Sequence, residues 1–409
     1  MELLQVDTVS EAVAKLREAV AGRLPRTVVR PLSEVLDAVL AEPALAPEDV
    51  PGFDRSTVDG YAVMAADTAG AGESLPCFLR LAGEVLMGQE APCAIGHGEC
   101  VYVPTGGMLP PGADAVVMVE YCDRFGDSVA VGDAVSPGRN VVWRGEDIKA
   151  GEAALTPGCR LRPSDIGVLA AVGKAEVKVW EGPRIAVFST GDEVVPVSRE
   201  RLETGQVRDI NSNAVAALAR RAGFQVTATA IIPDEEEQLR RTLKDAMAGN
   251  DVVAVSGGSS QGIKDMTERI IDSISSPGIL THGLAVKPGK PTILGWDEDS
   301  ATIFIGLPGH PVSAMTVFDN VLLGWWREAT AQSGRRPLAA RLDRNVMGSP
   351  GKETYQPVRL HLTEAGWLAE PVFYRSGLIS ALAAADGFFV LDRNREGLAA
   401  GEQVLVYLY

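Results

Sequence analysis

The stretch 251–270, DVVAVSGGSSQGIKDMTERI, runs from an apolar segment into glycine and serine and then into helical spacing. A solid apolar run before a helix is typical of a buried parallel strand and its crossover. The loop combines small residues, hydroxyl donors and a helix start, which together suit an anion. Taken alone, it could equally be an oxyanion cradle or a plain flexible connection, because it matches neither standard phosphate-loop pattern.

The same alternation continues on both sides of this stretch. The runs RIAVFS, FQVTATAII and TIFIG are predicted strands, and SNAVAALARRAG, DEEEQLRRTLKDAMAG and PVSAMTVFDNVLLGWW are predicted helices. Apolar strands that alternate with helices predict an α/β domain whose parallel sheet is covered on both faces.

Outside 183–327 the pattern changes. Short β-like runs fill 51–148 and 340–409, the latter with one small helix near 378–386, and further helices are predicted at 8–21, 33–42 and 163–172. The predicted division is a discontinuous domain (1–50 with 149–180), a β-rich domain (51–148), an α/β domain (181–332) and a C-terminal β domain (333–409).

Composition excludes several classes of function. The chain has 409 residues, a net charge of −16 and a sequence pI near 4.8, which argues against nucleic-acid or anionic-membrane binding. No apolar run is long enough to span a bilayer and no export leader is visible, so a cytoplasmic protein is expected. Five cysteines without a CxxC pair and four scattered histidines predict neither a disulfide framework nor a zinc site.

Donor-rich loops follow the predicted strands. Ligands of open α/β sheets bind beyond the carboxyl ends of the strands, so these loops should converge on one edge. The predicted anion-binding residues are Ser256, Gly257, Gly258, Ser259, Ser260 and Gly262 of the opening stretch, with Pro308, Gly309 and Pro311 of GLPGHP.

Charged residues should join the same edge. Glu193, Asp234 and Asp265 supply carboxylates, which could bind Mg²⁺ together with phosphate oxygens or could merely cap helices. Lys287 and Lys290, held on the Pro-Gly framework of VKPGKP, suit an anion clamp. We expect these groups to bind a phosphorylated ligand with the help of Mg²⁺.

Polar loops of the β-rich region form a second group. Asp59, Thr105 and Asp147 lie in Gly- and Pro-rich segments, where each alone is typical of turn chemistry. Together with the sheet edge they predict the opposite wall of a cleft between domains.

Eight segments, in this order, resemble the molybdopterin molybdenumtransferase family, to which the C-terminal domain of gephyrin is related. They are FDRSTVDGYAV, PTGGMLPPGADAVVMVE, RGEDIKAGE, STGDEVV, DINSNA, SGGSSQGIKDMT, VKPGKPTILG and GLPGHPVSA. The resemblance implies four domains, including a Rossmann-like molybdopterin-binding domain and a C-terminal β-barrel-like domain, in an elongated homodimer. It also implies an enzyme that uses Mg²⁺, molybdate and adenylylated molybdopterin, releases AMP, and has molybdopterin adenylyltransferase as its upstream partner.

The resemblance also assigns roles to residues. Asp59, Thr105 and Asp147 match the wall contributed across the dimer. The α/β acids are matched by Glu193, Asp234 and Asp265, with Glu193 and Asp265 as metal ligands. Lys287 matches a lysine that holds the incoming oxyanion, and Ser376 matches a serine of the last domain. The catalytic set is thus Asp59, Asp147, Glu193, Asp234, Asp265 and Lys287.

Three positions depart from the family pattern. Ser259 stands where valine is more usual, His310 replaces an asparagine, and Gly283 stands where many relatives carry a second lysine. These departures leave tungstate open as the oxyanion. A non-catalytic molybdopterin-binding scaffold and a Mg²⁺-dependent pyrophosphatase remain alternative functions.

Overall fold

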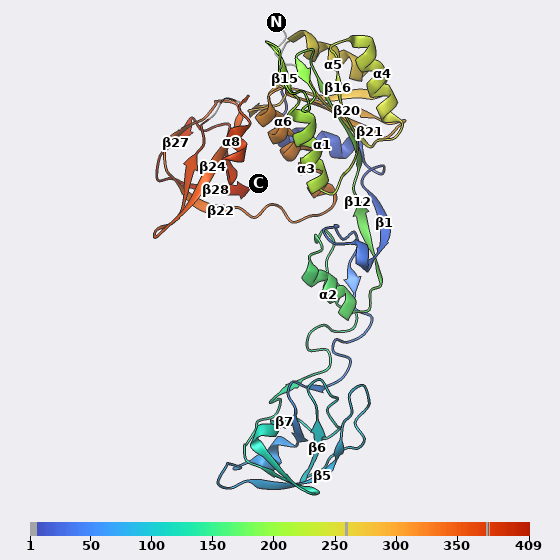
Figure 1. Ribbon diagram of the computed structural model, residues 1–409, viewed down its shortest axis with the longest axis vertical. Coiled ribbons are helices and arrows are strands. Elements are labelled where there is room, and N and C mark those ends of the chain that lie inside the picture. The colour runs from blue at the N-terminus through green and yellow to red at the C-terminus, as the bar shows by residue number, and fades with distance from the viewer. Residues whose placement is uncertain (1–5, 258–260, 374, 376) are drawn as a thin grey trace.

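The chain is elongated, with two domains side by side at one end and a third at the far end (Figure 1). The computed structural model describes residues 6–257, 261–373, 375 and 377–409, with the backbone alone for 261–265. The predicted multi-domain α/β class is confirmed.

The α/β domain has a six-stranded sheet in the order β16-β13-β17-β21-β20-β18. Its first four strands are parallel, as predicted, whereas β20 and β18 are antiparallel and extend one edge. The strands are β13 (Arg184–Thr190), β16 (Gln225–Ile232), β17 (Val252–Ser256), β18 (Pro277–His282), β20 (Ile293–Asp297) and β21 (Thr302–Leu307), with the small pair β14 (Val194–Val195) and β15 (Val207–Arg208) beside them.

Helices cover both faces of this sheet. One face packs in a core with α1 (Val9–Ala19), α3 (Asn211–Arg221), α6 (Pro311–Val317), the π-helical turn η4 (Phe318–Leu322) and α7 (Leu323–Ala329). The other face packs against α4 (Glu236–Met247) and α5 (Gln261–Ile274). The predicted cap of α1 is confirmed: the Thr8 hydroxyl accepts a hydrogen bond from Glu11 N, and the Glu11 carboxylate accepts one from Thr8 N.

The β-rich domain is a curled sheet in the order β7-β4-β6-β5-β9-β8. Its elements are β3 (Arg55–Ser56), β4 (Gly60–Val63), η2 (Ala65–Thr68), β5 (Cys77–Glu84), β6 (Glu99–Val103), β7 (Ala115–Met118), η3 (Val119–Tyr121), β8 (Cys122–Phe125), β9 (Ser128–Val131) and β10 (Val141–Val142). Two buried clusters, one on each face, hold it together.

The C-terminal domain is a closed five-stranded barrel, because β26 pairs back onto β24 in the order β24-β25-β22-β28-β26. Its elements are β22 (Leu338–Leu342), β23 (Val346–Met347), β24 (Glu353–Thr363), β25 (Gly366–Pro371), α8 (Ser380–Ala383), β26 (Gly387–Leu391), β27 (Gly397–Leu398) and β28 (Gln403–Leu408). Strand β19 (Val286–Lys287), which comes from the preceding segment, adds to β24.

A narrow stem connects the two ends of the molecule (Figure 1). Its main feature is the antiparallel ribbon of β1 (Arg26–Pro31) and β12 (Glu176–Glu181). The stem also holds η1 (Leu32–Glu34), α2 (Pro163–Ala171) and the short pair β2 (Ala44–Leu45) and β11 (Ala153–Leu155).

The helix predicted at 33–42 is wrong. Only the 3₁₀ turn η1 forms there, and Asp37 then adopts a left-handed φ of 63°. The backbone N–H of Leu40 donates to the carbonyl of Cys159, so its hydrogen bond goes to a neighbouring segment rather than to its own turn. Pairing with that segment outweighs the local helical spacing.

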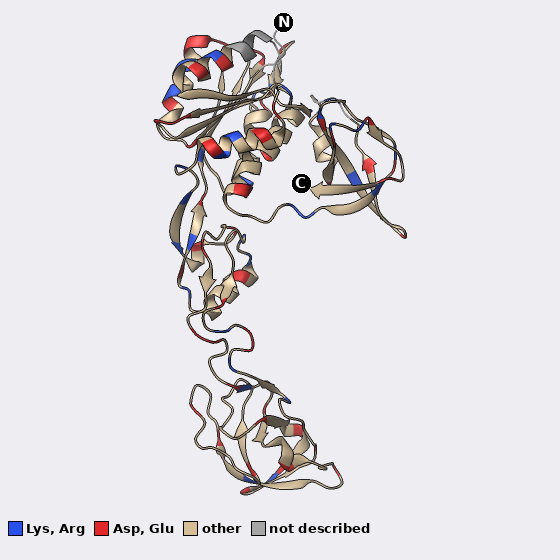
Figure 2. Cartoon of the chain, turned by 180° about the vertical axis from the view of Figure 1, so that it is seen from behind, with Lys and Arg blue, Asp and Glu red and all other residues tan. Residues whose placement is uncertain are grey.

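Charge is dispersed over the surface. Figure 2 shows acidic and basic residues mixed along the helices of the α/β domain. Among the described residues, no helix has the length and apolar character needed to cross a membrane.

Candidate functional site

The loops that follow β13, β17 and β21 meet at the carboxyl edge of the sheet, as predicted. Asn211, the first residue of α3, lies between them. Its Nδ2 donates to Ser256 Oγ at 2.7 Å and to the Gly309 carbonyl at 2.8 Å. Ser256 in turn donates to the Pro308 carbonyl at 3.2 Å. These four residues therefore form one hydrogen-bonded unit.

The orientation of the Asn211 amide follows from its partners. The Gly309 carbonyl can only accept, so the nitrogen of the amide must face it. Asn211 Oδ1 then points elsewhere, and it is a buried acceptor with no hydrogen-bond partner among the described residues. Such an acceptor is suited to a donor group on a bound ligand.

Asp209 lies next to this unit and supports it from the protein interior. It is 6% exposed and accepts hydrogen bonds from Ser189 Oγ at 2.7 Å and from Ser212 N at 3.1 Å. Its carboxylate therefore fixes the start of α3 rather than facing a ligand.

Two further buried polar atoms at this edge have no partner among the described residues. Thr190 ends β13 and is 2% exposed, and its Oγ1 is unpaired. Asp234 follows β16, and its Oδ1 is likewise unpaired. These unpaired atoms leave hydrogen-bonding capacity at the carboxyl edge, where open α/β sheets bind their ligands.

Acidic residues gather beside Asp234. The Asp192 carboxylate accepts a hydrogen bond from Asp234 N at 3.1 Å. Burial raises the pKa of Asp234, and the negative charges of Asp192 and Glu193 raise that pKa further. The local negative charge is thus uncompensated and favours a cation, although no three-ligand metal cluster occurs among the described residues.

The two predicted lysines are exposed on the connection between β18 and β20, which pairs with the C-terminal barrel through β19. Lys287 pairs with Thr354 in register as part of β19, and Lys290 follows it. Neither lysine has an ion-pair partner within the described ranges, so both ammonium groups are free for an anion. Gly283, just before them, has a left-handed φ of 93°, which favours glycine over lysine there.

Several predicted residues fall outside the description. Gly258, Ser259, Ser260 and Ser376 are not described, and of Gly262 and Asp265 only their place in the first turns of α5 is known. Gly257 and Pro311 flank the edge, at the end of β17 and the start of α6. The C-terminal domain also reaches this edge, since a Cβ on Gly377 would lie 3.8 Å from His310 Cδ2.

The second group of polar residues lies in the β-rich domain and at its base. Asp59 Oδ1 accepts hydrogen bonds from Thr105 N at 2.6 Å and from Thr105 Oγ1 at 2.8 Å. These two bonds lower the pKa of Asp59, the backbone bond most. Asp147 is exposed where the chain returns to the stem, and its backbone N–H donates to Val50 O.

Within one chain these two groups do not meet. The β-rich domain and the α/β edge lie at opposite ends of the molecule (Figure 1). The predicted cleft is therefore not formed by a single chain.

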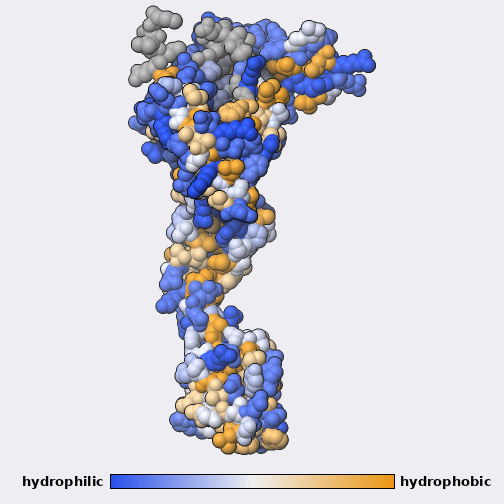
Figure 3. All heavy atoms as spheres, turned by 90° about the vertical axis from the view of Figure 1, so that its left-hand side faces the viewer, coloured by the Kyte–Doolittle hydropathy of each residue, from blue (hydrophilic) through white to orange (hydrophobic). Residues whose placement is uncertain are grey.

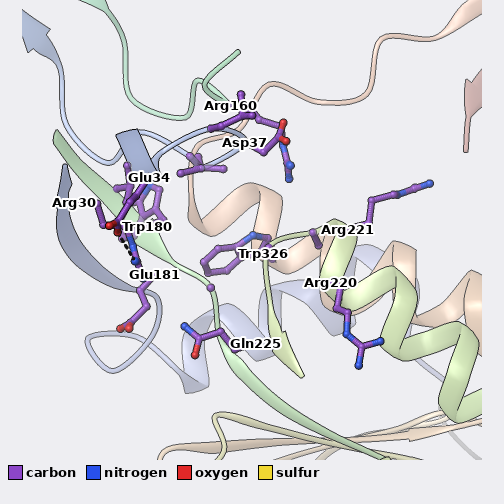
Figure 4. A pocket seen from close by; sticks show the side chains of 17 residues that line it. Arg30, Glu34, Asp37, Arg160, Trp180, Glu181, Arg220, Arg221, Gln225 and Trp326 are labelled. Carbon is purple, nitrogen blue, oxygen red and sulfur yellow. Dashed lines mark ion pairs between the residues drawn. The ribbon is translucent and has the colours of Figure 1, made fainter. Parts of the chain in front are cut away.

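A sizeable pocket lies away from both groups of predicted residues. It has a volume of about 560 Å³ and lies where the stem meets the α/β domain, with Trp180, Trp326 and Gln225 among its lining (Figure 4). None of the predicted site residues lines it. Burial raises the pKa of Cys100 and Cys122 to about 12, so these two thiols are protonated at neutral pH.

Asn211 and Thr190 were missed by the sequence reasoning. Both lie in segments that were recognised, DINSNA and STGDEVV, but an amide and a hydroxyl carry no charge signal. Their position at the carboxyl edge was the available clue.

Three family models match the chain. Residues 7–173 match "MoeA N-terminal region (domain I and II)", residues 186–328 match "Probable molybdopterin binding domain", and residues 339–409 match "MoeA C-terminal region (domain IV)". Together they span most of the sequence.

Known proteins are similar over nearly the whole length. The molybdopterin molybdenumtransferase of Haemophilus influenzae is 32% identical over 381 residues, covering 92% of each chain. That of Synechococcus elongatus is 31% identical over 398 residues, covering 97% of this chain and 98% of the relative. The crystal structure of a molybdopterin biosynthesis MoeA protein from Pyrococcus horikosii superposes with a TM-score of 0.80 at 34% identity, covering 99% of each chain. The chain therefore belongs to the MoeA family, whose curated members include the molybdopterin molybdenumtransferases.

Proposed function

We propose that this protein inserts molybdenum from molybdate into adenylylated molybdopterin and releases AMP, in the cytoplasm. The observation that carries the proposal is the carboxyl edge of the α/β sheet, where Asn211, Thr190 and Asp234 present unpaired buried polar atoms. A pterin bears both donors and acceptors, which suits this set. Family membership supports the reaction class.

The free lysines suit the anionic partners of the reaction. Lys287 and Lys290 lie on the connection between β18 and β20 of the α/β sheet, next to strand β24 of the C-terminal barrel, so they flank the edge. Their ammonium groups would neutralise the oxyanion and the pyrophosphate without forming a covalent bond. Binding and charge neutralisation are the roles assigned to them.

A magnesium ion fits the acidic group. Glu193 and Asp234 lie where negative charge is uncompensated, and Asp265 is the fifth residue of α5, the helix that follows the Ser256 loop. Mg²⁺ takes one or two carboxylates together with phosphate oxygens and water, so a three-acid cage is not required. When bound, the ion would stabilise charge on the pyrophosphate of the substrate.

The site is completed by a second copy of the chain. Asp59, Thr105 and Asp147 lie far from the sheet edge of their own chain (Figure 1), so only a partner can bring them there. Apolar side chains on the stem support an interface, since Val29, Leu36 and Leu45 are 58%, 55% and 48% exposed. Figure 3 shows hydrophobic residues on this narrow middle section. The adenylylated substrate must come from an adenylyltransferase, which is the expected upstream partner.

The test is AMP release from adenylylated molybdopterin with Mg²⁺, in the presence of molybdate, of tungstate, or of neither. Oxyanion-dependent release that Lys287→Gln abolishes and that Lys244→Gln, an exposed control on α4, retains would support the proposal and identify the metal. Release without any oxyanion would instead indicate a pyrophosphatase. Pterin binding without AMP release would indicate a scaffold.

Mixing two inactive variants tests the shared site. Asp59→Asn and Lys287→Gln disable different walls, so mixed dimers would contain one site with both walls intact. Partial recovery of activity on mixing is expected. No recovery, with mixed dimers confirmed by mass, would contradict a site built from two chains.

A further inference from the structure

A second pocket lies between the α/β domain and the C-terminal barrel. It has a volume of about 330 Å³, which is within the range of about 300–1,000 Å³ for small-molecule sites. One wall comes from α3 and α6, including Leu218 and Met315, and the other from α8 and the barrel, including Leu382 and Phe388. Most of its lining is therefore apolar, as in sites for organic ligands.

The charged side chains in the lining of this pocket are Asp319 and Arg221. Asp319 is 4% exposed and its Oδ1 accepts a hydrogen bond from Arg327 Nη1 at 3.3 Å, and its other oxygen is paired with Arg335. Arg221 lies within electrostatic range of Arg327. The Asp319 carboxylate is thus already paired with two guanidinium groups, and neither of these two arginines lines the pocket.

Arg221 is the member of this group that is free to bind. It lines the pocket and has no ion-pair partner in the part of the chain that the structure describes. Arg221 also belongs to the lining of the neighbouring stem pocket, and in Figure 4 its side chain points away from Trp326. Burial lowers the pKa of Arg327, the Asp319 carboxylate opposes this shift, and the charges of Arg335 and Arg221 add to it.

We propose that this pocket binds a small organic anion with an apolar, preferably aromatic, body. Its carboxylate or phosphate would pair with Arg221, and its body would occupy the space between Leu218, Leu382 and Phe388. Phe388 is suited to such a ligand because it already belongs to an aromatic group with Tyr355 and Tyr409. A bound anion would supply the second negative charge beside Asp319.

This site is distinct from the molybdopterin edge. Met315 lies one helical turn beyond Pro311 along α6, and none of the predicted site residues lines the pocket. The ligand would contact both domains, so its binding would also restrain how the C-terminal barrel sits against the α/β domain.

The experiment is isothermal titration calorimetry on the full-length protein. The probes are 3-phenylpropionate, phenyl phosphate, the neutral 3-phenylpropionamide, and inorganic phosphate, which lacks the apolar body. We expect 3-phenylpropionate and phenyl phosphate to bind at least about tenfold more tightly than the other two probes. The neutral amide lacks the charge that pairs with Arg221, and inorganic phosphate lacks the apolar body that fills the pocket. The better of the two anions identifies the head group.

Three variants locate the binding. Arg221→Gln should weaken anion binding about tenfold and leave the neutral amide unchanged. Arg220→Gln, one residue earlier on α3 and not part of this pocket, should change neither the anion affinity nor the amide affinity. Ala383→Phe, at an exposed pocket-lining position, should block all probes by filling the space. Circular dichroism would confirm that each variant is folded.

The proposal is overturned if no probe binds the wild type, if the amide binds as well as 3-phenylpropionate, or if Arg220→Gln and Arg221→Gln weaken anion binding equally. It does not depend on the transferase activity, so a failed AMP-release assay leaves it standing.

Discussion

Replacing Asn211 by aspartate is a direct test of the hydrogen-bonded unit at the sheet edge. The substitution keeps the size of the side chain but removes both N–H donors, which bind Ser256 Oγ and the Gly309 carbonyl. Two lost hydrogen bonds at about 0.5–1.5 kcal/mol each destabilise the domain by about 1–3 kcal/mol. The Asn211→Ala variant should lose the same two hydrogen bonds. Its destabilisation should be smaller than that of Asn211→Asp, because alanine also removes the unpaired Oδ1.

Asn211→Asp should add a dependence on pH. The new carboxyl faces the Gly309 carbonyl oxygen, which disfavours its charged form, so its pKa in the folded state lies above its unfolded value. A group with a raised folded pKa contributes most stability below its unfolded pKa and loses it as the pH rises through the folded value. If the shift is about two units, the deficit relative to wild type is about 1 kcal/mol larger at pH 8 than at pH 5.

The assay is urea denaturation followed by tryptophan fluorescence at both pH values. Trp296, Trp325 and Trp326 are buried in the α/β domain and report on its unfolding. Asn394→Asp is the control, because Asn394 is exposed and its side-chain amide makes no hydrogen bond within the described ranges. A deficit for Asn211→Asp that is below about 0.5 kcal/mol, or that is equal at both pH values, would refute the proposed orientation of the amide.

Three further predictions concern other parts of the molecule. Asp234→Asn should stabilise the protein at neutral pH and weaken its Mg²⁺ affinity. The reason is that the raised pKa of Asp234 makes its contribution to stability disappear as the pH rises. Urea denaturation and Mg²⁺ titration measure the two effects, and unchanged values in both would contradict the reasoning. Thr105→Val should raise the pKa of Asp59 towards its ordinary value while the backbone bond keeps it lowered, as measured by NMR titration, and a pKa that does not move would contradict the role of the hydroxyl. Gly182→Ala should destabilise the protein by at least about 2 kcal/mol, because the new Cβ would lie 1.8 Å from the Gly223 carbonyl oxygen. Gly167→Ala in α2, whose new Cβ would have no atom within 4 Å, should stabilise the protein slightly. Similar melting temperatures for the two variants would count against the contact at Gly182.

Patterns with a strong local signal were predictable from the sequence. The alternation over 183–327, the Thr8 cap of α1 and Pro163 at the start of α2 all appear in the structure, because each depends on neighbours along the chain. The site was predictable in outline for the same reason, since the Ser256 and Gly309 loops follow their strands directly.

Features that depend on distant partners were not predictable. The segment at 33–42 has helical spacing but pairs with the residues around Cys159, and β18 and β20 become strands only by pairing antiparallel with the sheet. The role of Asn211 depends on three loops that are far apart in sequence. The domain boundaries and the roles of individual site residues remain predictions.

The ribbon of β1 and β12 determines how far apart the two polar groups stand. Strand β12 pairs with β1 over six residues and also bonds to residues 39–41 along its other edge, so an added residue pair that keeps both pairings must fall at the Arg26–Glu181 end. One added pair would move the β-rich domain by about 3.3 Å and rotate it about the ribbon axis by the strand twist. The number of residue pairs in the ribbon therefore sets the distance between the two polar groups in discrete steps, without any change in the residues of either group.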